Sequence, residues 1–385
     1  MSEGNQGDIP LCDIQASFER HRSRIEPAVS RVLASGQVIL GPEVSGLECD
    51  IAAYCGSRHA VGCSSGSDAL LLALVALDMG PGDDVLLPPF TFFASAGAIR
   101  RTGARPVFVD IDSQSFNIDV NHVEKRLSTR TRAIMPVHLF GQCSDMSPLV
   151  DLARRRGIPL IEDAAQAFGA DDRGLKAGAI GNVGCFSFYP TKTLGAFGDA
   201  GMAVTNDANL AERMARLRVH GMETRYHHTS LGWNARLDAL QAAILRIKLP
   251  SVEDDIRARR EAARRYRELI DDQQIGDVIE RPFERFDARH TFNQYVVKVG
   301  NGLRDGLMRH LKAQGIGCEV YYPRPLHLQE CFAGLGYREG DFPVSEAMSR
   351  TVLAVPMFPE ITADQQQRVV EEMARYIRGA ARQAA

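Results

Sequence analysis

The chain has 385 residues, of which 45% are hydrophobic and 24% charged, and its formal net charge is −3. These values are typical of a globular protein of one or two domains, and the weak net charge argues against nucleic acid or a membrane surface as the main partner. The eight cysteines form no C-x-x-C pair, which favours reduced thiols in a cytoplasmic protein. The polar N-terminus does not resemble a signal peptide, and no run of 18 apolar residues predicts a membrane span.

The first 250 residues are predicted to form a large α/β domain. It starts with two amphipathic helices, at residues 11–35 and 43–54. Short apolar strands then alternate with helices, and we expect the strands at residues 60–63, 85–88, 107–110, 133–139, 159–162, 183–189 and 202–205. Strands that are apolar on both faces and alternate with helices indicate a mostly parallel, seven-stranded sheet covered on two sides. Ligands of such sheets bind at the carboxyl ends of the strands.

Residues 251–385 are predicted to form a smaller α+β domain. A charged, arginine-rich helix at residues 253–271 connects it to the large domain. Beyond that helix we expect strands at residues 291–299, 317–322 and 352–356, and helices at residues 303–314 and 362–380.

Lys192 is the first candidate for chemistry. It lies among aromatic residues and glycines, and no charged residue follows it until Asp199. Burial lowers the pKa of an amine, and a neutral amine is a nucleophile toward aldehydes, so Lys192 is a candidate Schiff-base lysine. The alternative interpretation is a loop lysine whose amine reaches water, and this stretch alone leaves both open.

Two further stretches carry polar groups at the ends of predicted strands. Gly66 and Ser67 begin a helix, where small residues and the helix dipole suit a phosphate, although serine-rich helix caps are common without any ligand. Asp163 ends a buried strand and is able to pair with a cationic ring nitrogen, or simply to cap the next helix. Gln166, one helical turn later, would face the same way, and Phe92 is able to stack on a flat ring or to pack in the core.

In chain order, these stretches resemble the DegT/DnrJ/EryC1/StrS sugar aminotransferases. The resemblance covers residues 10–375 and is carried by Ser-Gly-Ser-Asp-Ala-Leu, Phe-Thr-Phe-Phe-Ala, Pro-Val-His-Leu-Phe-Gly-Gln, Glu-Asp-Ala-Ala-Gln, Ser-Phe-Tyr-Pro-Thr-Lys, Gly-Asp-Ala-Gly, Gly-Trp-Asn-Ala-Arg and Tyr-Tyr-Pro-Arg-Pro-Leu-His-Leu-Gln. Two positions depart from the family pattern: Ser67 stands where the family often has threonine, and Ala200 where it usually has glycine. The serine keeps the hydroxyl, and neither change removes chemistry.

The resemblance implies a fold-type-I transferase that uses pyridoxal 5'-phosphate and passes through pyridoxamine 5'-phosphate during turnover. It implies a homodimer with shared active sites, in which Lys192 is the catalytic residue and binds the cofactor covalently. The other cofactor contacts that it implies are Gly66, Ser67 and Ser187 at the phosphate, Asn234 at the phosphate of the neighbouring subunit, Phe92 over the ring, Asp163 at the ring nitrogen and Gln166 at the ring hydroxyl.

The expected substrates are an amino donor, L-glutamate, and a nucleotide-linked keto sugar. A 3-keto hexose is expected because the segments 225–228 and 232–236 are similar to those of enzymes that aminate 3-keto sugars of uridine nucleotides. Residues 325–329 also resemble enzymes that use thymidine nucleotides, so the base stays open. The pathway would be amino-sugar biosynthesis for a surface polysaccharide or a secondary metabolite. Side chains that suit a nucleotide diphosphate or a carboxylate are expected to contact the substrate; these are His227, His228, Arg236, Tyr322 and His327.

Three alternatives were weighed against this interpretation. A sugar-nucleotide oxidoreductase is disfavoured, because no G-x-G-x-x-G follows an early strand. A non-catalytic regulatory homologue is disfavoured by the joint presence of Lys192, Asp163 and Gln166. A sugar dehydratase of the same family would carry histidine at the lysine position. No metal site is expected.

Overall fold

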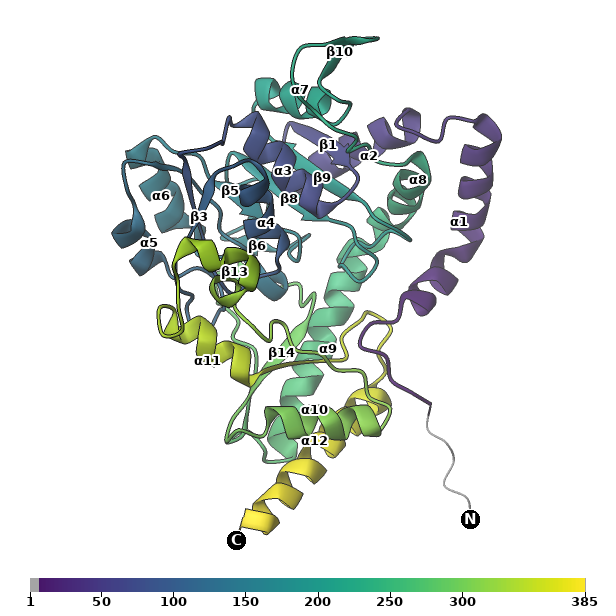
Figure 1. The fold of residues 1–385 in the computed structure, drawn as a ribbon. Helices are drawn as coiled ribbons and strands as arrows, with labels where there is room; N and C mark the ends of the chain where they lie inside the picture. The colour runs from purple at the N-terminus through teal and green to yellow at the C-terminus, as the bar shows by residue number, and fades with distance from the viewer. Residues whose placement is uncertain (1–6, 385) are drawn as a thin grey trace.

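The computed structural model describes residues 7–384 of the chain (Figure 1). It opens with two helices, α1 (Ile14–Ser35) and α2 (Pro42–Cys55), where the apolar periodicity predicted them. The Asp13 side chain caps α1 by accepting a hydrogen bond from the Ala16 N–H at 2.8 Å. Val32 of α1 packs against Ala239 and Ala243 of α8 (Ala239–Lys248). The first helix therefore lies along α8, outside the sheet (Figure 1).

The central strands divide into two neighbouring sheets. The first contains four strands in the order β1-β9-β8-β5, namely β1 (His59–Cys63), β9 (Gly201–Thr205), β8 (Val183–Ser187) and β5 (Ile161–Asp163). The second has the order β3-β2-β4, namely β3 (Arg105–Phe108), β2 (Asp84–Leu87) and β4 (Thr131–Ile134). All pairings are parallel except those of β9, which runs antiparallel to β1 and β8.

Each of the seven predicted stretches overlaps one of these strands, β3, β4 and β5 by two residues only, and the division into four and three was not predicted. Parallel bridges join the two sheets at Ile134 with Leu160 and at Val137 with Asp163. Pro136 and Pro159 lie beside these bridges, and proline has no N–H to donate to a ladder. The pairing between β4 and β5 is therefore reduced to isolated bridges.

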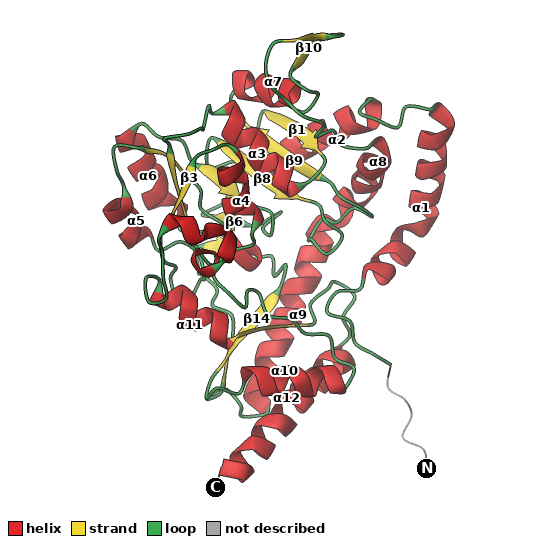
Figure 2. Cartoon of the chain, in the orientation of Figure 1, coloured by secondary structure: helices red, strands yellow, loops and turns green. Residues whose placement is uncertain are grey.

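Helices cover both faces of the strands (Figure 2). One face packs against α3 (Gly66–Ala76), α4 (Ala94–Arg101) and α7 (Ala208–Leu217). The other packs against α2, α8, α5 (Val120–Arg126) and α6 (Met146–Arg156). Because α3 touches strands and neighbouring helices at once, it is apolar nearly all round.

The C-terminal part is built on α9 (Val252–Asp272), which runs from the sheets to α10 (Arg304–Ala313) and α12 (Ala363–Ala384) (Figure 1). Its antiparallel sheet has the order β12-β14-β15, namely β12 (Ile279–Glu280), β14 (Tyr295–Val299) and β15 (Val352–Val355). The expected strand at residues 317–322 is wrong, because that segment makes one isolated bridge, between Glu319 and Ala354. The core of this part includes Phe90, Val137 and Phe140, so it packs directly against the carboxyl ends of the central strands.

Several short elements were not predicted: most have two or three residues, which give no readable periodicity, and the longest has nine. They are β6 (Asp171–Asp172), β7 (Leu175–Lys176), β10 (Met222–Thr224), β11 (His227–His228), β13 (Ala288–Arg289), α11 (Pro343–Thr351) and the 3-10 turns Leu139–Gly141, Leu249–Ser251, Leu326–Leu328 and Glu330–Leu335. The β10–β11 hairpin projects beyond α7 at the top of Figure 1. Among the described residues, no helix combines the length and apolar character that crossing a bilayer requires.

Candidate active site

The candidate residues meet at the carboxyl ends of the central strands, on the face covered by α3 and α4. Asp163 ends β5, Ser187 ends β8, and Gly66 begins the helix that follows β1. Lys192 lies in a turn after β8, where its own backbone N–H donates to the Tyr189 carbonyl at 2.9 Å. Residues from three separate strands therefore share one edge, as expected of α/β sheets.

Asp163 is a buried carboxylate with two hydrogen-bond donors. Its Oδ2 accepts from the Ser95 hydroxyl at 2.6 Å, and its Oδ1 accepts from the Ala165 N–H at 3.2 Å. Burial raises the pKa of this carboxyl, while the two donors and the Lys192 amine oppose the rise. A buried carboxylate of this kind favours a cationic partner that completes the neutralisation of its charge.

The Lys192 amine makes no hydrogen bond with any residue that the structure describes. Burial lowers its pKa to about 8, and the Asp163 carboxylate acts in the opposite direction. A substantial share of the amine is therefore neutral near pH 8, which is the state that attacks a carbonyl carbon. Lys192 is partly exposed as a residue, and its role as a Schiff-base lysine stays a prediction.

Three side chains that the sequence did not single out hold the loop that carries Lys192. The Asn293 Oδ1 accepts from the Thr193 N–H at 3.1 Å, and the buried Lys248 Nζ donates to the Gly195 carbonyl at 2.5 Å. Gln241 accepts from the N–H of Phe197 at 3.0 Å and donates to its carbonyl at 3.2 Å. These residues come from the C-terminal part and from α8, and the sequence shows no local signal that links them to the loop.

Gly66 and Ser187 lie against each other at the start of α3 and form the candidate phosphate cradle. A Cβ added at Gly66 would lie 2.6 Å from the Ser187 Cβ, so no larger residue fits there without a shift. Ser67 and Ser187 are partly exposed, and the N–H groups of Gly66 and Ser67 have no partner among the described residues. Because the start of a helix favours negative charge, this donor set fits a phosphate group.

Gln166, Phe92 and Tyr322 lie together next to Asp163. The Gln166 Oε1 accepts from the Phe140 N–H at 2.8 Å, and its Nε2 donates to the Tyr322 hydroxyl at 2.9 Å. The ring of Tyr322 lies 6.3 Å from that of Phe92, whose side chain is 57% exposed. Burial raises the pKa of Tyr322, which keeps its phenol neutral.

Four other predicted site residues, three substrate contacts and one cofactor contact, have no bond to the central pair of Asp163 and Lys192 in the part of the chain that the structure describes. His227 and His228 are on the exposed β10–β11 hairpin, and Asn234 is exposed as well. Arg236 is partly buried, and its Nε has no hydrogen-bond partner in the described chain. No hydrogen bond or ion pair among residues 7–384 connects these four side chains to Asp163 or Lys192.

His327, also expected beside the substrate, has a buried side chain. Its Nε2 lies 3.0 Å from Glu346 Oε1, and its ring packs edge-on against Phe342. Burial lowers the pKa of this imidazole, although Glu346 opposes the shift. In the structure His327 therefore supports the turn that precedes α11, and its contact with a substrate stays a prediction.

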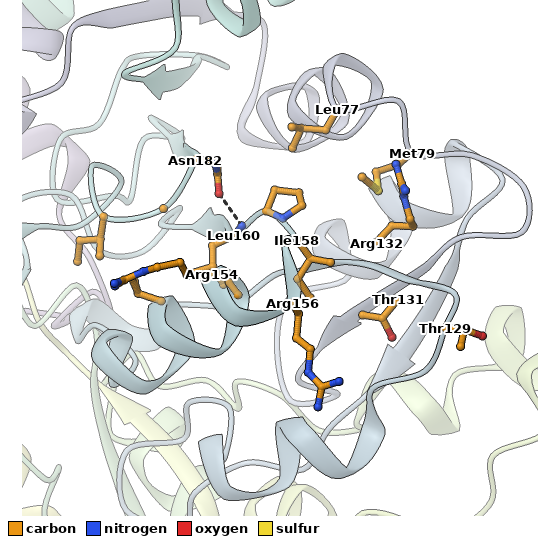
Figure 3. Close-up of a pocket in the computed structure, with 16 residues that line it drawn as sticks. Leu77, Met79, Thr129, Thr131, Arg132, Arg154, Arg156, Ile158, Leu160 and Asn182 are labelled. Atoms are coloured by element: carbon orange, nitrogen blue, oxygen red, sulfur yellow. Dashed lines mark hydrogen bonds between the residues drawn. The ribbon is translucent and has the colours of Figure 1, made fainter.

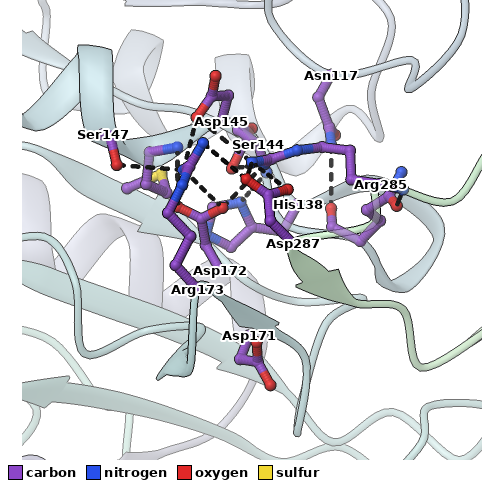
Figure 4. Close-up of polar contacts among 12 residues, drawn as sticks. Asn117, His138, Ser144, Asp145, Ser147, Asp171, Asp172, Arg173, Arg285 and Asp287 are labelled. Carbon is purple, nitrogen blue, oxygen red and sulfur yellow. Dashed lines mark hydrogen bonds and ion pairs between the residues drawn. The ribbon is translucent and has the colours of Figure 1, made fainter.

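His138 follows β4 but points to the opposite face from Asp163, because its neighbour Val137 pairs with Asp163 and side chains alternate along a strand. Its Nδ1 accepts from the Ser144 N–H at 3.2 Å and its Nε2 lies 2.9 Å from Glu162. Figure 4 shows the ionic network behind it, in which Arg173 and Arg285 contact three carboxylates, those of Asp145, Asp172 and Asp287. This cluster lies on the face of the strands opposite to Asp163, and it is outside the candidate site.

A surface pocket of about 760 Å³ lies at the other edge of the sheet (Figure 3). Thr131 begins β4, Leu160 precedes β5 and Asn182 precedes β8, so the pocket is at the amino-terminal ends of the strands. It is therefore separate from the edge that holds Lys192.

A model of the DegT/DnrJ/EryC1/StrS aminotransferase family matches residues 19–374. The chain is 46% identical, over 96% of its length and 99% of the relative's, to a protein of Geobacillus stearothermophilus named Pleiotropic regulatory protein. It is 41% identical, over 96% and 98%, to UDP-N-acetyl-3-dehydro-alpha-D-glucosamine 3-aminotransferase of Acidithiobacillus ferrooxidans. The crystal structure of S. venezuelae DesV in complex with a ketimine intermediate matches with a TM-score of 0.92 at 41% identity, covering 96% and 99% of the two chains. The chain belongs to the DegT/DnrJ/EryC1/StrS aminotransferase family.

Proposed function

We propose that the chain is a pyridoxal-phosphate-dependent aminotransferase, which moves an amino group from an amino acid, L-glutamate, to a nucleotide-linked keto sugar. The observation that carries the proposal is the Lys192 amine, whose pKa is lowered to about 8, in the field of the buried Asp163 carboxylate. The relative from A. ferrooxidans is named for a 3-dehydro sugar of a uridine nucleotide, which supports a 3-keto hexose as the acceptor. The product would enter amino-sugar biosynthesis.

Pyridoxal phosphate supplies a cationic ring that takes up the electron pair of the substrate Cα–H bond and stores the amino group between two half-reactions. Asp163 would hold the proton on the ring nitrogen through a charge-assisted hydrogen bond. Lys192, with its pKa of about 8, is the base that would move the proton between the substrate Cα and the carbonyl carbon of the cofactor. The Gln166 amide has a second N–H, beside the one given to Tyr322, for the ring hydroxyl.

Gly66, Ser67 and Ser187 would hold the phosphate in the cradle described above, with Phe92 over the ring. We propose that Asn234 reaches the phosphate of a partner subunit, because its side chain is exposed in the single chain. A homodimer would also cover Phe92 and Tyr226, which are 57% and 80% exposed. His227, His228 and Arg236, together with Tyr322 and His327, are the proposed contacts of the sugar nucleotide.

The finer features of the architecture are proposals as well. We propose fold type I, with the two central sheets acting as one seven-stranded sheet across the bridges at Ile134 and Val137. The proposed domains are residues 1–250 and 251–385, which meet at the turn Leu249–Ser251. Eight free cysteines fit a reducing compartment, and we propose a cytoplasmic location.

A regulatory role is the second candidate, because the relative from G. stearothermophilus is named as a regulatory protein. The neutral amine of Lys192 next to Asp163 favours catalysis, since a sensor that has lost turnover has no need for this pair. A dehydratase is disfavoured by the lysine itself.

The test is a half-reaction screen. The enzyme loaded with pyridoxamine phosphate is mixed with UDP- and dTDP-linked 3-keto and 4-keto hexoses, and the absorbance of the pyridoxal form is followed. We expect a nucleotide-linked 3-keto hexose to restore that absorbance fastest. Restoration by no sugar would remove the proposal, and equal rates with free and nucleotide-linked keto sugars would contradict the substrate class.

Gly66→Ala tests the phosphate cradle. The new Cβ would lie 2.6 Å from the Ser187 Cβ, so the start of α3 must move away from Ser187. We expect the displaced donors to cost roughly 2 kcal/mol, and the Kd for pyridoxal phosphate to rise about thirtyfold. Gly80→Ala is the matched control, because an added Cβ meets nothing within 4 Å there. An unchanged Kd in Gly66→Ala, measured by equilibrium dialysis, would place the phosphate elsewhere.

A further inference from the structure

Asp68 places a carboxylate in the first turn of α3, beside the phosphate cradle. Its Oδ2 accepts from the Ser64 hydroxyl at 2.5 Å and from the Ser65 hydroxyl at 3.1 Å. Its Oδ1 accepts from the indole N–H of Trp233 at 2.8 Å. One carboxylate thus binds three donors, which come from two segments 165 residues apart.

Both serine hydroxyls are occupied by this contact. Ser65 also accepts the Asp68 N–H at 3.1 Å, so its side chain closes the start of the helix and is turned away from a ligand. The donors that remain for an anion are the N–H groups of Gly66 and Ser67 and the hydroxyls of Ser67 and Ser187. Asp68 therefore selects which donors face the phosphate.

Trp233 lies on a segment, residues 232–236, that is also bonded to the end of β1. The Ser64 N–H donates to the Ala235 carbonyl at 3.1 Å, and Cys63 forms an antiparallel bridge with Arg236. The hydrogen bond from the indole to Asp68 adds a link between this segment and the start of α3. The cradle and the segment that carries Asn234 and Arg236 are consequently held as one unit.

We propose that Asp68 and Trp233 are positioning residues of the cofactor site: the indole fixes the carboxylate, and the carboxylate fixes the first turn of α3. Neither side chain donates to the phosphate itself. The proposal rests on the proposed function, because it takes the cradle as the place of the cofactor phosphate. Charge repulsion alone would predict the opposite effect on phosphate affinity. Removal of the negative charge of Asp68 beside a dianion should then tighten binding.

The experiment measures ligand binding to the apoenzyme, with inorganic phosphate and pyridoxal phosphate as separate probes. Asp68→Asn removes the charge, Trp233→Phe removes the indole N–H but keeps the ring, and a third protein carries both changes. We expect each single variant to weaken both probes roughly tenfold. The double variant should be no weaker than the weaker single one, because residues that act through one contact are not additive.

Trp233 is the single tryptophan of the chain, so its fluorescence reports on the cradle alone. In the wild type the emission should change when inorganic phosphate binds, and in Asp68→Asn this change should shrink with the weaker binding. A role confined to fold stability would lower the Tm without altering this signal.

Asp207→Ala is the control for lost stability, because alanine removes the cap of α7. Asp207 caps α7 by accepting from the N–H groups of Asn209 and Leu210 at 2.8 and 3.3 Å, far in sequence from the cradle. It should lose comparable stability and bind both probes as the wild type does. Tighter phosphate binding by Asp68→Asn, or a double variant whose loss equals the product of the single losses, would overturn the proposal. A wild type that binds the probes but performs no half-reaction would contradict the proposed function only.

Discussion

Lys192→Ala is expected to lower the rate of transamination by about ten-thousandfold, the upper range for a group that moves protons in the transition state. The variant should still bind pyridoxal phosphate, because the donors around Gly66 and Ser187 remain, but borohydride should no longer fix the cofactor to the chain. Single-turnover absorbance and peptide mass mapping of the reduced protein measure the two effects. Lys312→Ala, at a half-exposed lysine of α10, is the control.

The Lys192 amine also predicts how the rate of covalent cofactor capture depends on pH. Burial lowers the pKa of Lys192 to about 8, so the neutral, reactive form dominates above that pH and is lost as the pH falls through it. The rate at which the apoenzyme captures pyridoxal phosphate covalently should therefore fall about tenfold for each pH unit below 7. Lys248 is the relevant competitor, because burial lowers its pKa to about 8 as well. A pyridoxyl group mapped to Lys248 in the wild type would remove the assignment of Lys192.

Asp163→Asn is the second large effect. The amide keeps the size of the side chain and a hydrogen bond with Ser95, but it carries no charge to hold a proton on a ring nitrogen. We expect a loss of about a hundred- to a thousandfold in the rate of both half-reactions, as for removal of one preorganised electrostatic partner. Stopped-flow absorbance with glutamate and with a keto sugar measures the two halves.

Asp254→Asn is the control for that experiment, because Asp254 is an exposed residue of α9 that pairs with Arg257. A loss in only one half-reaction would contradict the role of Asp163, since both halves need the same ring. If the loss of activity in Asp163→Asn equals the fraction of the variant that is unfolded, the charge is needed for the fold.

The sequence predicted the meeting of Asp163, Lys192 and Gly66 because each follows a strand, and strand ends of a parallel sheet share an edge. It did not predict Asn293 or Lys248, because long-range hydrogen bonds to a loop leave no trace in local periodicity. Lys248 stands at the end of α8, where a lysine is usually solvated, and only the fold shows that its amine is buried against Gly195.

Two other differences between the prediction and the structure also have physical causes. Pro136 and Pro159 interrupt the pairing of β4 with β5, which the count of strands could not show. His327 has the composition of a ligand-binding segment around it, but its partner Glu346 lies 19 residues away on α11, and local sequence does not show this contact.

The hydrogen bond between Asn293 and the loop of Lys192 affects when that loop is completed during synthesis of the chain. The two residues that bond, Thr193 and Asn293, are 100 positions apart, and Asn293 belongs to the part that leaves the ribosome later. A nascent chain that ends near residue 250 has Lys192, Asp163 and the start of α3, but it lacks this clamp on the lysine loop. The loop of Lys192 therefore reaches its final setting only after Asn293 has been made and its part of the chain has packed, and we expect cofactor capture at Lys192 to follow that step.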